Sequence, residues 1–274
     1  MNSATALVEL ADGRAVLKWV PKGAAGALLA GCVIARRLAQ HGLVTGEPIP
    51  TITGELSHQT DSGAVALLQF VAGEHLIPDS PRDQHDLATT LAAVHAVEAT
   101  RQRGPFLSEQ VLDMVHDVEP WVRPTVGLVL EEYDRLPELT WGLLHGDPEC
   151  EAFLRQPESG TVALIDWSAS GFGPVLYDVA SALMYLGGRQ NADSFWAAYV
   201  SHSPAPASEL AEHVGTFTRY RAAVQAAYFS MRIARADRTG IDGDHENWKG
   251  LRDAELMLRA NGMEPITDRP APEC

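Results

Sequence analysis

Cysteine is scarce in this sequence, which has only Cys32, Cys150 and Cys274 among its 274 residues. An odd, widely spaced set of three argues against a disulfide framework and is typical of reduced thiols in a cytoplasm. Long hydrophobic runs are also missing, because no stretch approaches the roughly 20 apolar residues of a membrane span. The first residues, Met1–Thr5, lack the basic region and apolar core of a secretory signal. We therefore expect a cytoplasmic protein with no membrane partner.

Basic residues are few, because 21 lysines and arginines stand against 36 aspartates and glutamates, which gives a net charge of −15. Nucleic acids are bound by positively charged surfaces, so we expect no nucleic-acid partner. A negative field concentrates cationic ligands, including amine-rich small molecules. The alternative is that the negative surplus only keeps the protein soluble.

Motifs of common hydrolases are missing as well. The sequence contains no Gly-x-Ser-x-Gly elbow, no His-Glu-x-x-His and no paired Cys-x-x-Cys. What is present is an ordinary globular composition, with 46% hydrophobic and 21% charged residues. A chain of this length can bury a full core, as one large domain or as two lobes.

The first 75 residues read as a small sheet with one helix. Two aliphatic segments, Ala6–Leu10 and Arg14–Val20, flank Asp12-Gly13, a strong hairpin signal. A helix is expected over about 25–41, ended by Gly42. The prolines in 48–53 favour an extended edge segment, and the apolar run 64–71 favours a buried strand.

Beyond residue 80 the pattern is mainly helical, because apolar residues recur at helical spacing. Two short apolar runs, Trp141–Leu144 and Val162–Ile165, read as buried strands, and Gly171–Pro174 reads as a turn cluster. The last residues form a proline-rich tail. Helices are expected over 83–98, 108–135, 177–186, 192–201, 207–236 and 243–260.

Each short apolar run leads into a carboxylate. The first is followed by His145-Gly146-Asp147, and the second runs directly into Asp166. One carboxylate can take a proton from a hydroxyl, and the other can hold a divalent cation against phosphate oxygens. These are the minimum parts of a phosphoryl-transfer site. The alternative is that both aspartates only cap turns.

The joint order of several short motifs resembles the aminoglycoside phosphotransferase family of small-molecule kinases, which are relatives of the eukaryotic-like protein kinases. Each motif alone is weak, but together they span nearly the whole chain. The motifs are Val16-Leu-Lys18, Leu67–Gly73, Leu91-Ala-Ala-Val-His95, Leu143-Leu-His-Gly-Asp147, Leu164-Ile-Asp-Trp167, Gly173-Pro174 and Tyr177-Asp178-Val-Ala180.

The resemblance implies an α+β, bilobal, protein-kinase-like fold. Residues 1–73 would form an N-terminal nucleotide-binding lobe, a small antiparallel sheet with one helix. Residues 74–274 would form a larger, mostly helical lobe that carries the catalytic loop and the acceptor site. The start of the first lobe looks shortened, because the family's leading strand and glycine-rich turn have little room before the hairpin.

The resemblance also implies roles for single residues. Asp147 would be the catalytic base for the acceptor hydroxyl, and Asp166 would hold Mg²⁺ against the nucleotide phosphates. Lys18 would place its charge on the outer phosphates. Backbone groups near Gln69 and Val71 would hydrogen-bond the base of ATP or GTP. His145 is expected to hold the loop, and Asp178 to support it from the following helix.

Two residues of the family's nucleotide site have no counterpart here. The family's second metal ligand, an asparagine, is replaced by Ala152, so Glu149 or Glu151 would have to reach the metal; Glu151 is our candidate. The helix that usually carries a glutamate partner for Lys18 has no acidic residue between Ala24 and Gln40. Lys18 therefore lacks its usual partner or takes one from elsewhere.

We expect an ATP-dependent phosphotransferase that acts on a hydroxyl of a small molecule, including cationic ones, in antibiotic resistance or natural-product biosynthesis. A close variant is a kinase for Ser or Thr of a biosynthetic peptide. The alternative class is a catalytically impaired pseudokinase that acts through a protein partner. The retained Asp147 and Asp166 favour the enzyme.

Overall fold

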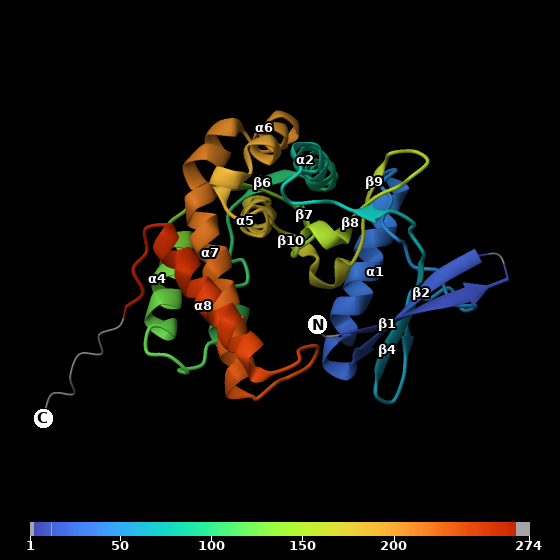
Figure 1. Cartoon of the computed structure of the whole chain (residues 1–274), viewed down its shortest axis with the longest axis horizontal. Coiled ribbons are helices and arrows are strands. Elements are labelled where there is room, and N and C mark those ends of the chain that lie inside the picture. Colours follow the sequence, from blue (N-terminus) through green and yellow to red (C-terminus); the bar gives the residue numbers. More distant parts are fainter. Residues whose placement is uncertain (1–2, 12, 267–274) are drawn as a thin grey trace, which may run out of the picture. The chain divides into compact units, whose positions relative to one another are not determined.

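The structure is a computed structural model that describes residues 3–11 and 13–266. The chain forms two compact units (Figure 1). Among the described residues, the first unit comprises residues 3–101 and Thr140–Ser208, and the second comprises Gln102–Leu139 and residues 209–266. Asp12 of the predicted turn and most of the proline-rich tail lie outside the described residues. The lobe boundary at residue 73 stays a prediction.

A four-stranded antiparallel sheet opens the first unit, in the order β1-β2-β4-β3. The predicted hairpin is confirmed, because β1 pairs with β2 from Ala4↔Trp19 to Leu10↔Gly13. The edge segment predicted over 48–53 is extended only at its start, where Pro48 bridges to Leu68, and it turns at residues 52–54. The strands are β1 (Ala4–Leu10), β2 (Gly13–Pro21), β3 (His58–Gln59) and β4 (Gly63–Gln69).

Helix α1 (Ala25–Gln40) follows a short 3-10 turn and lies against this sheet (Figure 1). Its alanine-rich sequence has high helix propensity, and Gly42 ends it with φ of +88°. The helix and the sheet share a small buried core, formed by Val20, Ala25, Leu28, Cys32, Ala64 and Ala66.

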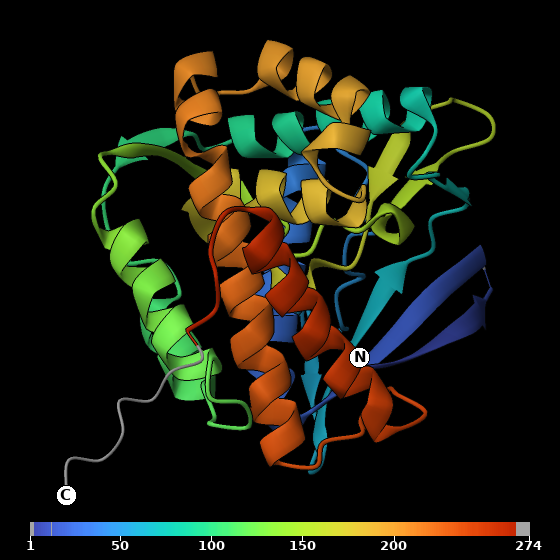
Figure 2. The same cartoon turned by 60° about the vertical axis from the view of Figure 1, so that its left-hand side comes forward.

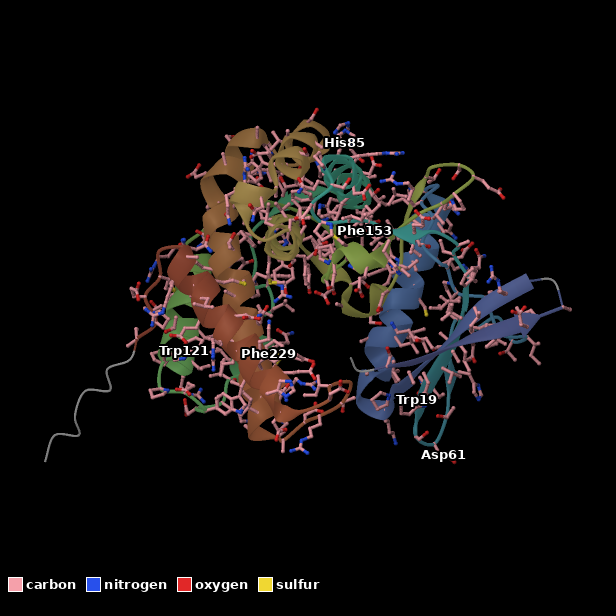
Figure 3. All side chains as sticks on the ribbon, viewed as in Figure 1. Trp19, Asp61, His85, Trp121, Phe153 and Phe229 are labelled. Carbon is pink, nitrogen blue, oxygen red and sulfur yellow. The ribbon has the colours of Figure 1, made fainter. Side chains whose placement is uncertain are left out.

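Two three-stranded sheets carry the rest of the β-structure. One has the order β5-β8-β9, from Glu74–His75, Phe153–Arg155 and Val162–Leu164. The other has the order β10-β7-β6, from Gly171–Pro174, Leu139–Leu144 and Thr100–Gln102. Phe153, labelled in Figure 3, is fully buried.

The prediction of a turn at Gly171–Pro174 was wrong, because this segment is strand β10. It pairs with β7 from Gly171↔Leu144 to Pro174↔Trp141. Glycine and proline signal turns only statistically. Here Pro174, which has no N–H to donate, stands at the last position of an edge strand, where proline is tolerated.

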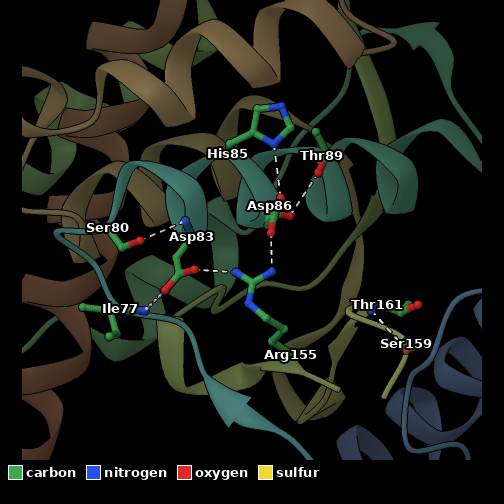
Figure 4. Close-up of polar contacts among 9 residues, drawn as sticks. All are labelled: Ile77, Ser80, Asp83, His85, Asp86, Thr89, Arg155, Ser159 and Thr161. Carbon is green, nitrogen blue, oxygen red and sulfur yellow. Dashed lines mark hydrogen bonds and ion pairs between the residues drawn. The ribbon is translucent and has the colours of Figure 1, made fainter. Parts of the chain in front are cut away.

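Three helices complete the first unit: α2 (Pro81–Ala96), α5 (Leu176–Tyr185) and α6 (Asp193–His202), of which α2 and α6 lie side by side (Figure 2). Ser80 caps α2 by accepting a hydrogen bond from the Asp83 N–H at 3.3 Å, and Pro81 fills the first turn. The guanidinium of Arg155 on β8 reaches α2 and pairs with both Asp83 and Asp86 (Figure 4).

The second unit is built from α3 (Ser108–Met114), α4 (Val122–Asp134), α7 (from Ala207 to Ala234) and α8 (Asp244–Ala260). The single helix predicted over 108–135 was wrong. Pro120 explains the break, because proline disfavours a helical residue before it and cannot donate to the preceding turn. The helices predicted over 207–236 and 243–260 are confirmed.

Helices α7 and α8 pack closely (Figures 2 and 3). A Cβ on Gly250 of α8 would lie 2.3 Å from the ring of Phe229, so only glycine fits there. Arg232 of α7 is fully buried and donates to Asn247 and to the carbonyl of Thr239. Its charge is therefore used inside the unit. Within residues 3–11 and 13–266, none of the helices combines the length and hydrophobicity needed to cross a bilayer.

Candidate functional site

The two segments that carry Asp147 and Asp166 touch each other. The Nε2–H of His145 donates to the carbonyl of Ile165 at 2.9 Å. Gly146 has φ of +85°, and a Cβ there would lie 2.1 Å from the carbonyl oxygen of Ala169. Only glycine allows this approach. The turns that follow β7 and β9 are therefore held together within three residues of each aspartate.

The carboxylate of Asp178 on α5 holds the His145–Asp147 loop in place by hydrogen bonds. Its carboxylate accepts the N–H of His145 at 2.6 Å and that of Gly146 at 2.9 Å. It also accepts Nε2–H of His95 at 3.1 Å, and Nδ1 of the same ring is hydrogen-bonded to the Tyr199 hydroxyl at 2.6 Å. All five residues except Gly146 are buried. The network explains how α2, α5 and α6 fix the loop.

The predicted base Asp147 is exposed at the end of this loop, and the hydroxyl of Tyr185 from α5 donates to its Oδ1. Two more acids follow in the chain, Glu149 and Glu151. Burial, together with the charges of Asp147 and Glu151, raises the pKa of the Glu149 carboxyl. Three acidic side chains thus lie within residues 147–151, and their mutual repulsion favours the protonated form of Glu149.

Asp166 makes the ion pair that links the sheet to the second turn. Lys18 Nζ, buried on β2, donates to Asp166 Oδ1 and to Ser168 Oγ at 2.6 Å, and the Ser168 hydroxyl donates to the same Oδ1 at 2.9 Å. Burial raises the pKa of Asp166, but the charge and hydrogen bond of Lys18, the Ser168 hydroxyl and His145 outweigh burial and hold it below its ordinary value. Asp166 is thus kept ionised.

Helix α1 supports this turn by backbone contact and carries no acidic side chain. A Cβ on Gly31 would lie 2.4 Å from the carbonyl oxygen of Trp167, in the 3-10 turn Trp167–Ala169. The indole N–H of Trp167 donates to the carbonyls of Leu164 and Thr45. Lys18 therefore takes its partner from the Asp166 turn, which is one of the two outcomes expected from the sequence.

The predicted base-binding segment lies beside this turn. A Cβ on Gly46 would lie 3.3 Å from the Gln69 carbonyl oxygen, 3.6 Å from Val71 Cγ2 and 3.4 Å from Ile165 Cγ2. Gln69 N–H already donates to the Glu47 carbonyl at 2.9 Å. Within the described part of the chain, the backbone of Val71 makes no hydrogen bond. The role of Gln69 and Val71 in binding a base stays a prediction.

Glu151, the candidate second metal ligand, has an exposed side chain, and its carbonyl accepts from His75 Nδ1 at 2.7 Å. Its role stays a prediction. The carbonyl of Ala152 accepts the Ile165 N–H at 2.9 Å, so position 152 adjoins the Asp166 turn but offers no side-chain oxygen. No group of three or more histidines, cysteines or acids among residues 3–11 and 13–266 is arranged to hold a metal.

Sequence reasoning missed two side chains that contact the aspartates, Ser168 and Tyr185. Tyr185 lies on the apolar helix α5, where the sequence pattern favours burial in the core. Cys150 lies in the same loop as Asp147 and is buried. Burial, with the charges of Glu149 and Asp83, raises the pKa of its thiol to about 11, which keeps it protonated and unreactive.

Comparison with known proteins agrees with this arrangement. Residues 2–248 match the phosphotransferase enzyme family. No sequence among curated proteins matches the chain. An amicoumacin kinase bound to AMP-PNP, Ca²⁺ and amicoumacin is similar in structure, with a TM-score of 0.73 at 13% identity, covering 97% of this chain and 88% of that one.

Two further solved structures are similar. Choline kinase from Streptococcus pneumoniae has a TM-score of 0.67 at 17% identity, covering 93% of this chain and 89% of that one. A spectinomycin phosphotransferase with ADP and spectinomycin has a TM-score of 0.62 at 11% identity, covering 94% and 89%. At these identities the likeness shows the fold alone, and it confirms the predicted α+β, protein-kinase-like fold.

Proposed function

Because the chain belongs to the phosphotransferase enzyme family, we propose that it transfers the terminal phosphoryl group of ATP to a hydroxyl of a small molecule. The observation that carries this proposal is the contact between the Asp147 and Asp166 turns, with Lys18 paired to Asp166. The residues proposed as base, metal ligand and phosphate-binding cation, Asp147, Asp166 and Lys18, thus lie on adjoining segments. These are the groups that phosphoryl transfer requires.

Asp147 would orient the acceptor hydroxyl and accept its proton as the bond to phosphorus forms. Its exposure makes it accessible to an acceptor, and the Tyr185 hydroxyl fixes one of its two oxygens. Because Asp178 and Gly146 fix the loop backbone, the carboxylate would be positioned before substrate arrives, which limits the entropy lost on binding.

Lys18 would bind the phosphates, and Asp166 would hold Mg²⁺ against them. A carboxylate and a hydroxyl, Asp166 and Ser168, already surround the ammonium of Lys18 here, and such oxygen donors fit Mg²⁺, which also keeps waters and phosphate oxygens as ligands. Bound Mg²⁺ would neutralise charge on the phosphates. The base of the nucleotide would bind the backbone near Gln69 and Val71, which lies beside Ile165.

The acceptor would be an antibiotic or a natural-product intermediate. Structurally similar proteins include kinases of amicoumacin, choline and spectinomycin. The acidic residues Asp147, Glu149 and Glu151 and the net charge of −15 would favour an acceptor that carries an amine. A Ser or Thr of a peptide is the variant that keeps the same chemistry.

One observation favours a second candidate, a pseudokinase that binds a protein partner. Ala152 adjoins the Asp166 turn but offers no oxygen where the resemblance implies a second metal ligand. The intact Lys18–Asp166 pair and the Asp147 loop favour the enzyme.

The proposal is tested by replacing the base. Purified protein is assayed with amicoumacin, spectinomycin, choline and aminoglycosides, with release of ADP from ATP and of GDP from GTP measured in parallel. Asp147→Asn should lower kcat by roughly 10²–10⁴-fold, because general-base catalysis contributes that much. Its affinity for ATP should change less than about threefold, since Asp147 does not hold the nucleotide.

The matched control is Asp61→Asn. Asp61 is exposed on the turn before β4 (Figure 3), so this variant loses the same charge with no loss of turnover. Turnover that survives in Asp147→Asn would contradict the assigned role.

A further inference from the structure

The ammonium of Lys18 lies in a small site made of two oxygens. It donates to Asp166 Oδ1 and, at 2.6 Å, to Ser168 Oγ. Within the described residues, Ser168 supplies the only side-chain oxygen that is hydrogen-bonded to Asp166, at 2.9 Å. A carboxylate and a hydroxyl that jointly hold one cation form a site that another cation can use.

The neighbouring position makes this hydroxyl important. Ala152, whose carbonyl accepts the Ile165 N–H, has no side-chain oxygen to offer a metal. Glu151 is exposed and its backbone is bound to His75. Ser168 is held next to Asp166 by the 3-10 turn Trp167–Ala169, which α1 supports at Gly31. Its hydroxyl is therefore fixed near the carboxylate that the resemblance assigns to the metal.

We infer that Asp166 and Ser168 form one cation position that Lys18 occupies when no nucleotide is bound, and that Ser168 Oγ is the second protein ligand of the divalent cation. The inference rests on the proposed function. On nucleotide binding, Lys18 transfers its hydrogen bonds from Asp166 and Ser168 to the phosphates, and the two oxygens turn to the divalent cation.

Charge balance supports this exchange. Lys18 is only 4% exposed, and a buried cation without an anion is strongly unfavourable. The phosphates give Lys18 a new anionic partner at the moment when Asp166 gains a divalent cation. No buried charge is left alone at either stage. The hydroxyl serves both states, because it can accept from an ammonium or give a lone pair to a metal.

The first test measures Mn²⁺ alone by electron paramagnetic resonance. Lys18→Gln should bind Mn²⁺ at least several-fold more tightly than the natural protein, because the competing ammonium is gone. Adding Ser168→Ala to this variant should abolish most of the gain. An unchanged affinity in Lys18→Gln, or a gain that survives in the double variant, overturns the inference. Lys22→Gln, an exposed neighbour, controls for loss of a nearby charge.

The second test uses Mn²⁺ with AMP-PNP and circular dichroism to check the fold. Ser168→Ala should weaken metal binding in the complex by about tenfold, as losses around a metal typically do. Ser170→Ala is the matched control, because its hydroxyl donates to the Trp167 carbonyl at 2.6 Å in the same turn and makes no contact with Asp166. Equal affinity in Ser168→Ala and Ser170→Ala would overturn the ligand assignment.

Asp166→Asn separates the inference from the proposed function. If Asp166→Asn weakens binding and Ser168→Ala does not, only the inference fails. If neither variant changes the affinity for the metal with nucleotide, the proposed function fails as well.

Discussion

Asp178 shows how one buried carboxylate can position a loop. It is fully buried and accepts three N–H groups, from the backbone of His145 and Gly146 and from the ring of His95. Two of these are backbone groups that would otherwise be buried without a partner, which costs about 1–3 kcal/mol each. The placement of Asp147 thus depends on a residue that has no part in the chemistry.

Asp178→Asn should destabilise the protein by about 2–3 kcal/mol, because an amide has one acceptor oxygen and its NH₂ would face a backbone N–H. Urea unfolding monitored by fluorescence measures the change. Asp61→Asn on the exposed turn should stay within about 0.5 kcal/mol of the natural protein. A loss no larger than that of the control would show that Asp178 does not hold the loop.

The sequence predicted part of the site at this scale. Asp147, Asp166 and Lys18 follow from motifs, and the contacts of His145 and Asp178 agree with the support expected of them. Ser168 and Tyr185 could not be predicted. Asp166 has φ of +64°, and this left-handed residue sends the chain into the 3-10 turn that brings Ser168 back to the carboxylate. A short turn of this kind has no regular spacing of apolar residues, so the sequence pattern does not reveal it.

At the scale of elements, helix α1 takes an unusual part in the site. It carries no acidic partner for Lys18, and it approaches the Trp167–Ala169 turn by backbone at Gly31. A side chain at this position would push the turn and helix apart. Helix α1 therefore supports the Trp167–Ala169 turn by close packing at Gly31 and not by a charged side chain.

Gly31→Ala tests this packing against Gly26→Ala in the same helix. Nothing lies within 4 Å of a Cβ on Gly26, so alanine there should stabilise the protein by about 0.5–1 kcal/mol through helix propensity. At Gly31 the clash with the Trp167 carbonyl should outweigh this gain and cost about 1–3 kcal/mol net. Urea unfolding measures both, and equal stabilisation of the two variants would disprove the close contact.

The elements themselves were predicted unevenly. Helices with clear caps, such as α2 after Ser80 and α1 before Gly42, were found within a few residues. The wrong predictions concern segments whose sequence pattern is compatible with two structures. Pro120 breaks an amphipathic run that looks continuous, and Gly171–Pro174 forms a strand because β7 offers a partner. Pairing partners distant in sequence are invisible to a local pattern.

On the scale of the whole molecule, the residues assigned to catalysis and nucleotide binding all belong to one compact unit, residues 3–101 with Thr140–Ser208. The second unit has its own buried polar contacts, such as those of Arg232, and an aromatic cluster of Tyr133, Phe217 and Tyr220. On α7, Arg219 pairs with Glu132 and the buried Arg232 donates to Asn247, so both charges are used within this unit.

Thermal unfolding of the whole molecule distinguishes an enzyme from a pseudokinase. A ligand that binds only the native state stabilises it by RT ln(1 + [L]/Kd), which is about 2.7 kcal/mol at 100 times Kd. For a protein of this size that corresponds to a rise in Tm of roughly 5–10 °C. We expect this rise with AMP-PNP and Mg²⁺ together, and a much smaller one in Asp166→Asn or with EDTA.

Hydrogen exchange should place the added protection in peptides around Lys18 and Asp166, whose side chains already form the ion pair. If millimolar nucleotide and metal leave Tm and exchange unchanged, nucleotide binding has been lost, and the pseudokinase becomes the better description.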